Sequence, residues 1–160
     1  MTGEAIAAGG PPPPPVLVAL ARARAGAHSL PPELVCAIVE QESSWNPWTL
    51  RYEPAFYDRY IQPQIARGAL ADETETRARA FSWGLMQVMG QVARENGFSG
   101  VSLAALCEPA VGLDIGCRVF TGKLAAAERN VTRALLLWNG GANPHYADAV
   151  LARASRYTTT

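Results

Sequence analysis

The chain has 160 residues, enough for one domain with a sizeable core. Its 14 basic and 14 acidic residues balance to a net charge of zero, which gives no support to nucleic-acid binding. Cys36, Cys107 and Cys117 are too few and too scattered for a disulfide scaffold, and no pair has the C-x-x-C spacing typical of a zinc site. We expect buried thiols in preference to a Cys107–Cys117 disulfide, and no metal or organic cofactor.

The N-terminal residues 1–15 are small and Gly-rich and end in five prolines. This composition predicts a disordered leader that ends in a stiff spacer, ahead of a single domain over residues 16–160. No basic start precedes a long apolar run, so the segment is unlike a Sec signal peptide. The apolar stretch from Val16 is too short and too charged to cross a membrane, and we expect no membrane insertion.

Helical patterns account for most of the remaining chain. Ser29 is a candidate N-cap for the second helix. Few strands are indicated, so the predicted fold class is mainly α, with at most a small hairpin near Gly84–Gln87. The predicted elements, in chain order, are a helix over 16–25, a helix that begins at Pro31 or Pro32 and ends before Pro47, a mixed segment over 48–80, a short exposed helix near 71–81, a turn or hairpin over 81–90 that leads into a helix up to about 96, a short helix before Pro109 and a longer one after it, a helix over 131–139, and a last helix from Pro144 to about Arg156.

Two glutamates, Glu40 and Glu42, stand near the end of the second predicted helix. At 100° per residue, Glu42 lies within about 60° of the centre of the apolar stripe through Val35 and Ile38, whereas Glu40 lies about 140° away. We therefore expect Glu42 to continue the buried stripe and Glu40 to point toward solvent. Burial raises the pKa of a carboxyl group, and a carboxyl that stays protonated can act as a general acid. The alternative is that the helix frays and Glu42 reaches water.

Four short motifs then follow one another along the chain. They are Glu42-Ser43 with Trp45 and Asn46-Pro47, then Gly84-Leu85-Met86-Gln87, then Trp138-Asn139-Gly140-Gly141, then Tyr146 in the last predicted helix. In this order they resemble the soluble lytic transglycosylase (SLT) domains, which have a goose-type lysozyme-like fold, over roughly residues 30–157. Two positions depart from the family pattern. Trp138 replaces the usual tyrosine, which removes or moves any hydroxyl role, and Gly112 replaces the usual asparagine.

The resemblance implies that the substrate is the peptidoglycan glycan strand, cut at the MurNAc–GlcNAc β-1,4 bond. Glu42 would protonate the glycosidic oxygen. The same group, now a carboxylate, would take the proton from the muramoyl C6 hydroxyl as that oxygen closes onto C1. The product is a 1,6-anhydro sugar, and a single carboxyl suffices because the nucleophile is already tethered to the sugar.

The resemblance also implies roles for neighbouring residues. Ser43 would bond the muramoyl side or order the site, unless it is a solvent-facing hydroxyl at a helix end. Met86 would pack against a sugar ring or lie in the core, and Gln87 would contact sugar amide or hydroxyl groups. Asn139 would hold its loop, contact substrate or merely end a helix, and Tyr146 would hydrogen-bond Glu42 and help to set its proton affinity. The candidate sugar-stacking platforms, each of which could instead be a core residue, are Trp45, Trp48 and Trp83.

Glu53 lies in an aromatic and charged stretch that resembles a segment of some phage-type muramidases. Glycosidases that use water generally need a second carboxylate, which inverting enzymes hold about 6.5–9.5 Å from the first. If Glu53 or Asp58 reaches the site, the alternative function is a muramidase with Glu42 as its acid. Otherwise Glu53 pairs with Arg51, Arg59 or Arg67. A third hypothesis, from a different class, is a catalytically silent glycan-binding module.

Because no export signal is evident, the sequence predicts a phage or prophage protein, such as an endolysin released by a holin or an enzyme carried in a virion. It would act on the periplasmic or extracellular cell wall. Its expected partners are peptidoglycan glycan strands, and we expect a monomer.

Overall fold

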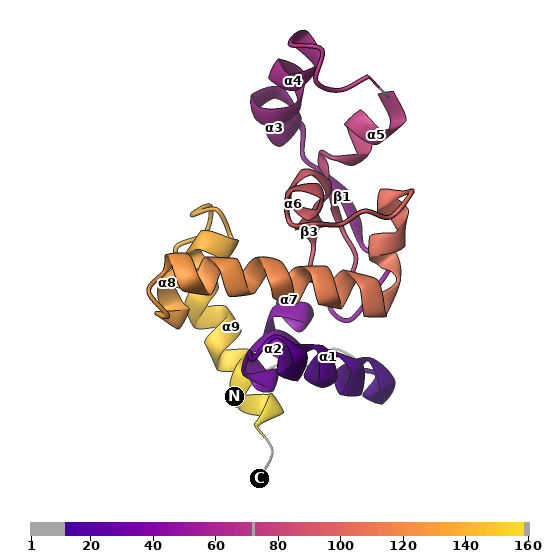
Figure 1. Ribbon diagram of the computed structural model, residues 1–160. Helices are drawn as coiled ribbons and strands as arrows, with labels where there is room; N and C mark the ends of the chain where they lie inside the picture. Colours follow the sequence, from indigo (N-terminus) through magenta and orange to yellow (C-terminus); the bar gives the residue numbers. More distant parts are fainter. Residues whose placement is uncertain (1–11, 72, 159–160) are drawn as a thin grey trace, which may run out of the picture.

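Helices form most of the described chain, residues 12–71 and 73–158, in the computed structural model (Figure 1). The expected fold class, mainly α with a small hairpin, is confirmed. The helices are α1 (Pro15–Ala27), α2 (Pro32–Ser43), α3 (Pro54–Phe56), the π-helix η1 (Tyr57–Ile61), α4 (Gln62–Ala66), α5 (Glu73–Ala78), α6 (Gly90–Glu95), the 3₁₀-helix η2 (Leu103–Cys107), α7 (Pro109–Ala126), α8 (Val131–Trp138), α9 (Tyr146–Ala154) and the 3₁₀-helix η3 (Ser155–Tyr157). The strands are β1 (Leu50–Tyr52), β2 (Phe81–Trp83) and β3 (Val88–Met89).

The predicted leader over residues 1–15 lies mostly outside the described residues, which begin at residue 12. Its last residue, Pro15, is the first residue of α1. Proline suits this position because its φ is already near the helical value and its missing N–H would have no partner in the first turn. The start of the first helix is therefore one residue earlier than predicted.

The helix α2 lies at the centre of the helical core, packed against α1 on one side and α9 on another. All its residues from Leu34 to Val39 are buried, so the helix is enclosed on nearly every side up to its last turn. In Figure 1 the long helix α7 crosses the molecule between the α1–α2 pair and the small sheet, and α8 and α9 lie together near one end of α7. Within residues 12–71 and 73–158, no helix combines the length and the apolar character that a bilayer-spanning segment requires.

The prediction that Ser29 caps α2 is wrong. Pro31 occupies the N-cap position, and no side chain caps this helix. Ser29 has φ of 55° and belongs to the turn that closes α1, in which the Leu30 N–H donates to the Ala25 carbonyl at 2.9 Å. The backbone at Ser29 is therefore committed to ending one helix before the prolines begin the next.

A three-stranded antiparallel sheet, in the order β1-β2-β3, stands on the other side of α7. Strands β2 and β3 form the hairpin predicted near residues 84–87, with Trp83 opposite Val88. Strand β1 comes from the segment predicted only as mixed, and it pairs Leu50 with Trp83. It also brings the residues that follow α2 alongside this hairpin.

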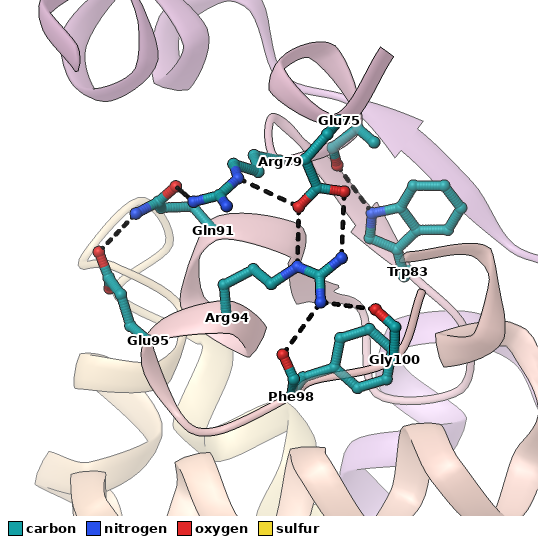
Figure 2. Close-up of polar contacts among 9 residues, drawn as sticks. Glu75, Arg79, Trp83, Gln91, Arg94, Glu95, Phe98 and Gly100 are labelled. Atoms are coloured by element: carbon teal, nitrogen blue, oxygen red, sulfur yellow. Dashed lines mark hydrogen bonds and ion pairs between the residues drawn. The ribbon is translucent and has the colours of Figure 1, made fainter. Parts of the chain in front are cut away.

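A polar network fastens α5 to α6 and to the loop that follows α6 (Figure 2). The Arg94 guanidinium donates to both carboxylate oxygens of Glu75, at 2.7 and 3.1 Å, and to the carbonyls of Phe98 and Gly100, at 3.1 and 2.7 Å. Arg79 donates to the same Glu75 carboxylate at 3.2 Å. These charge-assisted bonds hold the pKa of Glu75 below its usual range. They hold α5 against α6, which lie next to the outer ends of the hairpin strands β2 and β3 in the sequence.

The cysteines Cys36, Cys107 and Cys117 are buried free thiols, as predicted in preference to a disulfide. Burial raises the pKa of the Cys36 thiol to about 11 and that of the Cys117 thiol to about 12. The pKa of Cys107 is raised for the same reason.

Candidate active site

The carboxyl group of Glu42 is held by side chains from two other helices. Glu42 lies in the last turn of α2 and is half-buried. Its Oε1 accepts a hydrogen bond from the Tyr146 hydroxyl at 2.5 Å and another from the Trp138 indole Nε1 at 3.1 Å. Tyr146 begins α9 and Trp138 ends α8, so the site forms where three helix ends meet.

Burial is the main influence on the Glu42 carboxyl, and it raises the pKa. The hydrogen bonds from Tyr146 and Trp138 and the positive charge of Arg51 act in the opposite direction without cancelling the effect of burial. Burial and the nearby Glu42 charge also raise the pKa of Tyr146, whose hydroxyl therefore stays protonated throughout the neutral range. The site thus has the environment of a carboxyl that holds its proton longer than an exposed glutamate.

Glu40 points away from Glu42 but does not face open solvent, which corrects the expectation from the helical spacing. Its carboxylate accepts hydrogen bonds from the Tyr157 hydroxyl, at 2.6 Å, and from Arg156. Both donors come from the C-terminal segment η3, which the apolar pattern of α2 alone could not place there. Glu40 is therefore a structural anchor on the opposite face of the helix.

Ser43 ties the end of α2 to the Gly-Leu-Met-Gln turn. Its side chain is buried, and its hydroxyl lies 3.0 Å from the Val39 carbonyl and 2.9 Å from the Leu85 carbonyl. The alternative of a solvent-facing hydroxyl is therefore wrong. With its proton engaged by backbone carbonyls, Ser43 is placed to order the site.

Gln87 has φ of 50°, in the left-handed region that glutamine seldom occupies, and its side chain stabilises that turn. Its Nε2 donates to the carbonyls of Thr49 and Gly84, each at 2.9 Å, and its Oε1 accepts from the Ser82 hydroxyl at 2.8 Å. Both amide protons are thus used within the protein, and neither is left for the expected sugar contact. The Gln87 amide instead joins the hairpin to the segment that follows α2.

Met86 is 1% exposed and fills the core between the hairpin and α7. A Cβ added at Gly116 of α7 would lie 2.3 Å from the Met86 sulfur, so the two elements are in close contact. The expectation that Met86 packs against a sugar ring is wrong, because the side chain faces the interior. Its core alternative holds.

Asn139 is the C-cap of α8, and its Nδ2 donates to the Asn143 carbonyl at 3.2 Å. This bond spans the turn through Gly140 and Gly141, whose φ values of 66° and 75° suit glycine. The side chain therefore holds the loop that leads from Trp138 to Tyr146.

Glu53 forms an ion pair with Arg51, with Arg51 Nε 2.5 Å from Glu53 Oε1. Arg51 is one of the three arginines with which Glu53 was expected to pair if it has no catalytic role. Asp58 lies in the π-helix η1 and accepts from the Gln62 side chain at 2.9 Å. Neither acid hydrogen-bonds Glu42, whereas the charge of Arg51 does reach Glu42.

The three tryptophans considered as sugar platforms have different environments. Trp45 is 5% exposed and donates to the Tyr157 hydroxyl at 2.9 Å, so it is a core residue. Trp83 is half-buried and donates to the Ala78 carbonyl at 3.0 Å. Trp48 is 71% exposed, with its backbone N–H fixed by the Asn46 side chain at 3.0 Å. Of the three, Trp48 has a ring face available for stacking.

Sequence reasoning did not identify Trp138 and Arg51 as site residues. Trp138 stands in the third motif, but its replacement of tyrosine suggested a lost function and not a second donor to Glu42. Arg51 carried no signal except its position two residues before Glu53. Both assignments depend on how distant segments pack.

A separate hollow of about 350 Å³ lies between α1, the loop at residues 97–100 and the first half of α7. Arg24, Asp114 and Arg118 contribute to its lining, and none of the predicted site residues does. Among the described residues, no group of three or more His, Cys, Asp or Glu side chains is placed to hold a metal ion.

The comparisons with known proteins give one match. A family model described as "Transglycosylase SLT domain" matches residues 19–156. No curated protein matches the chain, and no solved structure matches it.

Proposed function

We propose that this chain, which belongs to the transglycosylase SLT domain family, cuts the MurNAc–GlcNAc β-1,4 bond of peptidoglycan and leaves a 1,6-anhydro-MurNAc end. Membership of the family supports lytic transglycosylase activity on peptidoglycan in general. The observation that carries the finer proposal is the Glu42 carboxyl, which is half-buried, has a raised pKa and is fixed by Tyr146 and Trp138.

In the proposed reaction, Glu42 gives up one proton and then takes up another. The protonated carboxyl first gives its proton to the glycosidic oxygen while the bond from that oxygen to C1 breaks. The carboxylate then takes the proton of the muramoyl C6 hydroxyl while the C6 oxygen bonds to C1. The proton balance closes without water, and the enzyme returns to its starting state.

The raised pKa suits both steps. A carboxyl that ionises at a higher pH retains more of the acid form near neutrality, and its conjugate base is also the stronger proton acceptor. Tyr146 and Trp138 stabilise the ionised form between the two transfers, so the group is not so basic that it fails to release its proton.

The neighbouring residues are proposed as supports for this group. Ser43 and Gln87 hold the hairpin against the end of α2, and Asn139 holds the loop before Tyr146. Met86 supports the hairpin from within the core. Trp48, exposed close after α2 in the sequence, is proposed as the stacking platform for a sugar ring.

The ion pair at Glu53 favours transglycosylation over hydrolysis. A muramidase would require a second carboxylate able to activate water, and the Glu53 carboxylate is bonded to the Arg51 guanidinium. The charge of Arg51 also acts on Glu42. We therefore assign Glu53 a supporting role, in which it orients an arginine near the acid.

The test is digestion of purified peptidoglycan followed by mass spectrometry of the products. We expect anhydro ends from the natural enzyme, a loss of about 10²–10⁴-fold or more for Glu42→Gln, and unchanged product chemistry for Glu53→Gln. Reducing ends would instead identify a hydrolase. Sedimentation with cell walls without clearing them, by the natural protein and Glu42→Gln alike, would identify a glycan-binding module.

The route by which the protein reaches the cell wall stays a prediction. Phage origin with release by a holin, or transport in a virion, is proposed on the sequence grounds given above. The monomeric state likewise stays a prediction, as does the single-domain division at residue 16.

A further inference from the structure

The two oxygens of the Glu42 carboxyl have different surroundings. Both protein donors reach Oε1, from the Tyr146 hydroxyl at 2.5 Å and from the Trp138 indole at 3.1 Å. Among the described residues, no hydrogen-bond donor is found for Oε2. One oxygen is therefore fixed by the protein, and the other is left for a reacting partner.

The chemistry of the indole group determines which of the two oxygens is the acceptor. An indole N–H can only donate, so the oxygen that it faces must be an acceptor whether the carboxyl is protonated or not. The raised pKa of Tyr146 keeps its hydroxyl protonated, and that hydroxyl donates to the same oxygen. In the neutral acid, the oxygen that accepts two hydrogen bonds is the carbonyl oxygen, and the proton resides on the other one.

We infer that Glu42 carries its working proton on Oε2, and that Trp138 is a positioning residue that keeps Oε1 an acceptor. The inference rests on the proposed function for its role and refines it to single atoms. Oε2 gives its proton to the glycosidic oxygen as the bond to C1 breaks. Oε2 then receives the proton of the C6 hydroxyl as the new C1–O6 bond forms.

The surroundings of Trp138 fit a fixed indole. Its ring packs edge-on against Phe120 of α7, with centroids 5.7 Å apart and planes at 70°. The family pattern has tyrosine at this position, and a phenol could rotate its hydroxyl either to donate or to accept. Tryptophan removes that freedom, so in this chain the direction of the bond does not change during the cycle.

Charged and titratable groups among the described residues also act on Glu42 and on Tyr146. Tyr146 on α9 and Arg51 on β1 act on Glu42, and Arg153 on α9 acts on Tyr146. A change in the Glu42 pKa on altering Trp138 must therefore be measured with these three residues unchanged.

The test compares Trp138→Phe with Trp83→Phe. Both indoles are half-buried and both donate a hydrogen bond, but Trp83 donates to the Ala78 carbonyl, whereas Trp138 donates to Glu42 and also acts on Tyr146. We expect Trp138→Phe to raise the pKa of Glu42, read by ¹³C NMR of the labelled carboxyl, because a donor to the ionised form is lost. We also expect kcat to fall about 10-fold with little change in KM, and the alkaline limb of the pH profile to move upward. Trp83→Phe should leave all three unchanged.

Infrared spectroscopy locates the proton directly and does not depend on activity. In the spectrum of the natural protein minus that of Glu42→Gln, at a pH where Glu42 is protonated, the carbonyl stretch should lie at the low wavenumber of a doubly hydrogen-bonded C=O. It should move to higher wavenumber in Trp138→Phe.

A carbonyl band at the position of a C=O without hydrogen bonds would overturn the inference, even if Trp138→Phe failed to fold. An unchanged Glu42 pKa in folded Trp138→Phe, or an equal change in Trp83→Phe, would also overturn it. These spectroscopic outcomes are separate from the product analysis, because anhydro ends test the proposed function and the two spectra test the proton position.

Discussion

At the scale of single residues, the last turns of α2 place two glutamates in opposite electrostatic situations. Glu42 loses water and gains two neutral donors, so burial dominates and its pKa rises. Glu40 gains the positively charged Arg156 and the Tyr157 hydroxyl. On the same helix, two positions apart, the ionised Glu42 carboxylate therefore destabilises the fold and the Glu40 carboxylate stabilises it.

At pH values above the pKa of the folded Glu42 carboxyl, we expect Glu42→Gln to raise Tm. A folded pKa above the unfolded value means that the folded state binds the proton more tightly. The native protein then loses stability as pH rises from the unfolded pKa through the folded one. An always neutral amide avoids this loss. Thermal unfolding should show a gain of about 2–4 °C per kcal/mol relieved, and this gain should shrink to nothing below the unfolded pKa of about 4.3.

Glu40→Gln is the control for that measurement, because it makes the same chemical change on the other face of α2. It should lower Tm at neutral pH, since Arg156 loses its carboxylate partner. A lower Tm for Glu42→Gln, at neutral pH, would contradict a carboxyl with a raised pKa.

The spacing of the sequence predicts which of these glutamates is sheltered, but not what shelters it. The 100° step places Glu42 with Val35 and Ile38, and this depends on α2 alone. The donors Trp138 and Tyr146 stand 96 and 104 residues away, and their approach depends on how α8 and α9 pack. For the same reason Gln87, with a motif that resembles the family's, was expected to contact substrate although its amide protons are used within the turn.

At the scale of elements, close backbone contact at two glycines sets the positions of the hairpin and of α7 against η2. A Cβ at Gly84 would lie 2.4 Å from the Leu106 carbonyl oxygen, and one at Gly112 would lie 2.3 Å from the same oxygen. Both distances are far below a normal contact, so only glycine fits. The family's usual asparagine at position 112 is therefore replaced where this chain packs η2 directly on α7.

We expect Gly112→Ala to destabilise the fold by at least about 1–3 kcal/mol, because the new methyl group meets a backbone oxygen that cannot turn aside. The control is Gly122→Ala in the same helix, where nothing beyond the neighbouring residues and the helix's own backbone lies within 4 Å of the new Cβ. There the better helix propensity of alanine should stabilise by about 0.5–1 kcal/mol. Urea unfolding of both variants measures the difference. Equal effects would contradict the close contact at Leu106.

Long helices with a repeated apolar spacing were predicted, whereas short elements were not. The patterns at α2 and α8 extend over two or more turns, and their ends carry proline or glycine signals. Strand β1 has three exposed residues and forms only because β2 supplies its hydrogen bonds. The π-helix at Tyr57–Ile61 has no sequence signature of its own. Elements that depend on other segments for their stability cannot be predicted from the local sequence pattern alone.

At the scale of the whole molecule, the C-terminal segment closes the helical core. Tyr157 is 7% exposed, and its ring packs against Trp45, with centroids 5.9 Å apart. Its hydroxyl bonds Glu40 and its carbonyl accepts from Arg22. One residue near the end of the chain thus joins α1, α2 and the loop after α2.

We expect a chain that ends at Ala154 to be less stable by about 3–5 kcal/mol, since it loses a large buried aromatic side chain and the Arg156 ion pair. A chain that ends at Thr158 keeps every one of these contacts and is the control. Chemical denaturation of the two chains gives the comparison. Equal midpoints would show that the segment adds nothing to the core.

The burial of the thiols affects how the protein behaves in an oxidising compartment. Only a thiolate attacks an oxidant or another disulfide, and the elevated pKa values of Cys36 and Cys117 leave almost none at neutral pH. Secreted and periplasmic proteins meet enzymes that oxidise exposed cysteines. Once folded, this chain should pass through such a compartment with its sulfur chemistry unchanged, needing neither a cross-link nor a reductant.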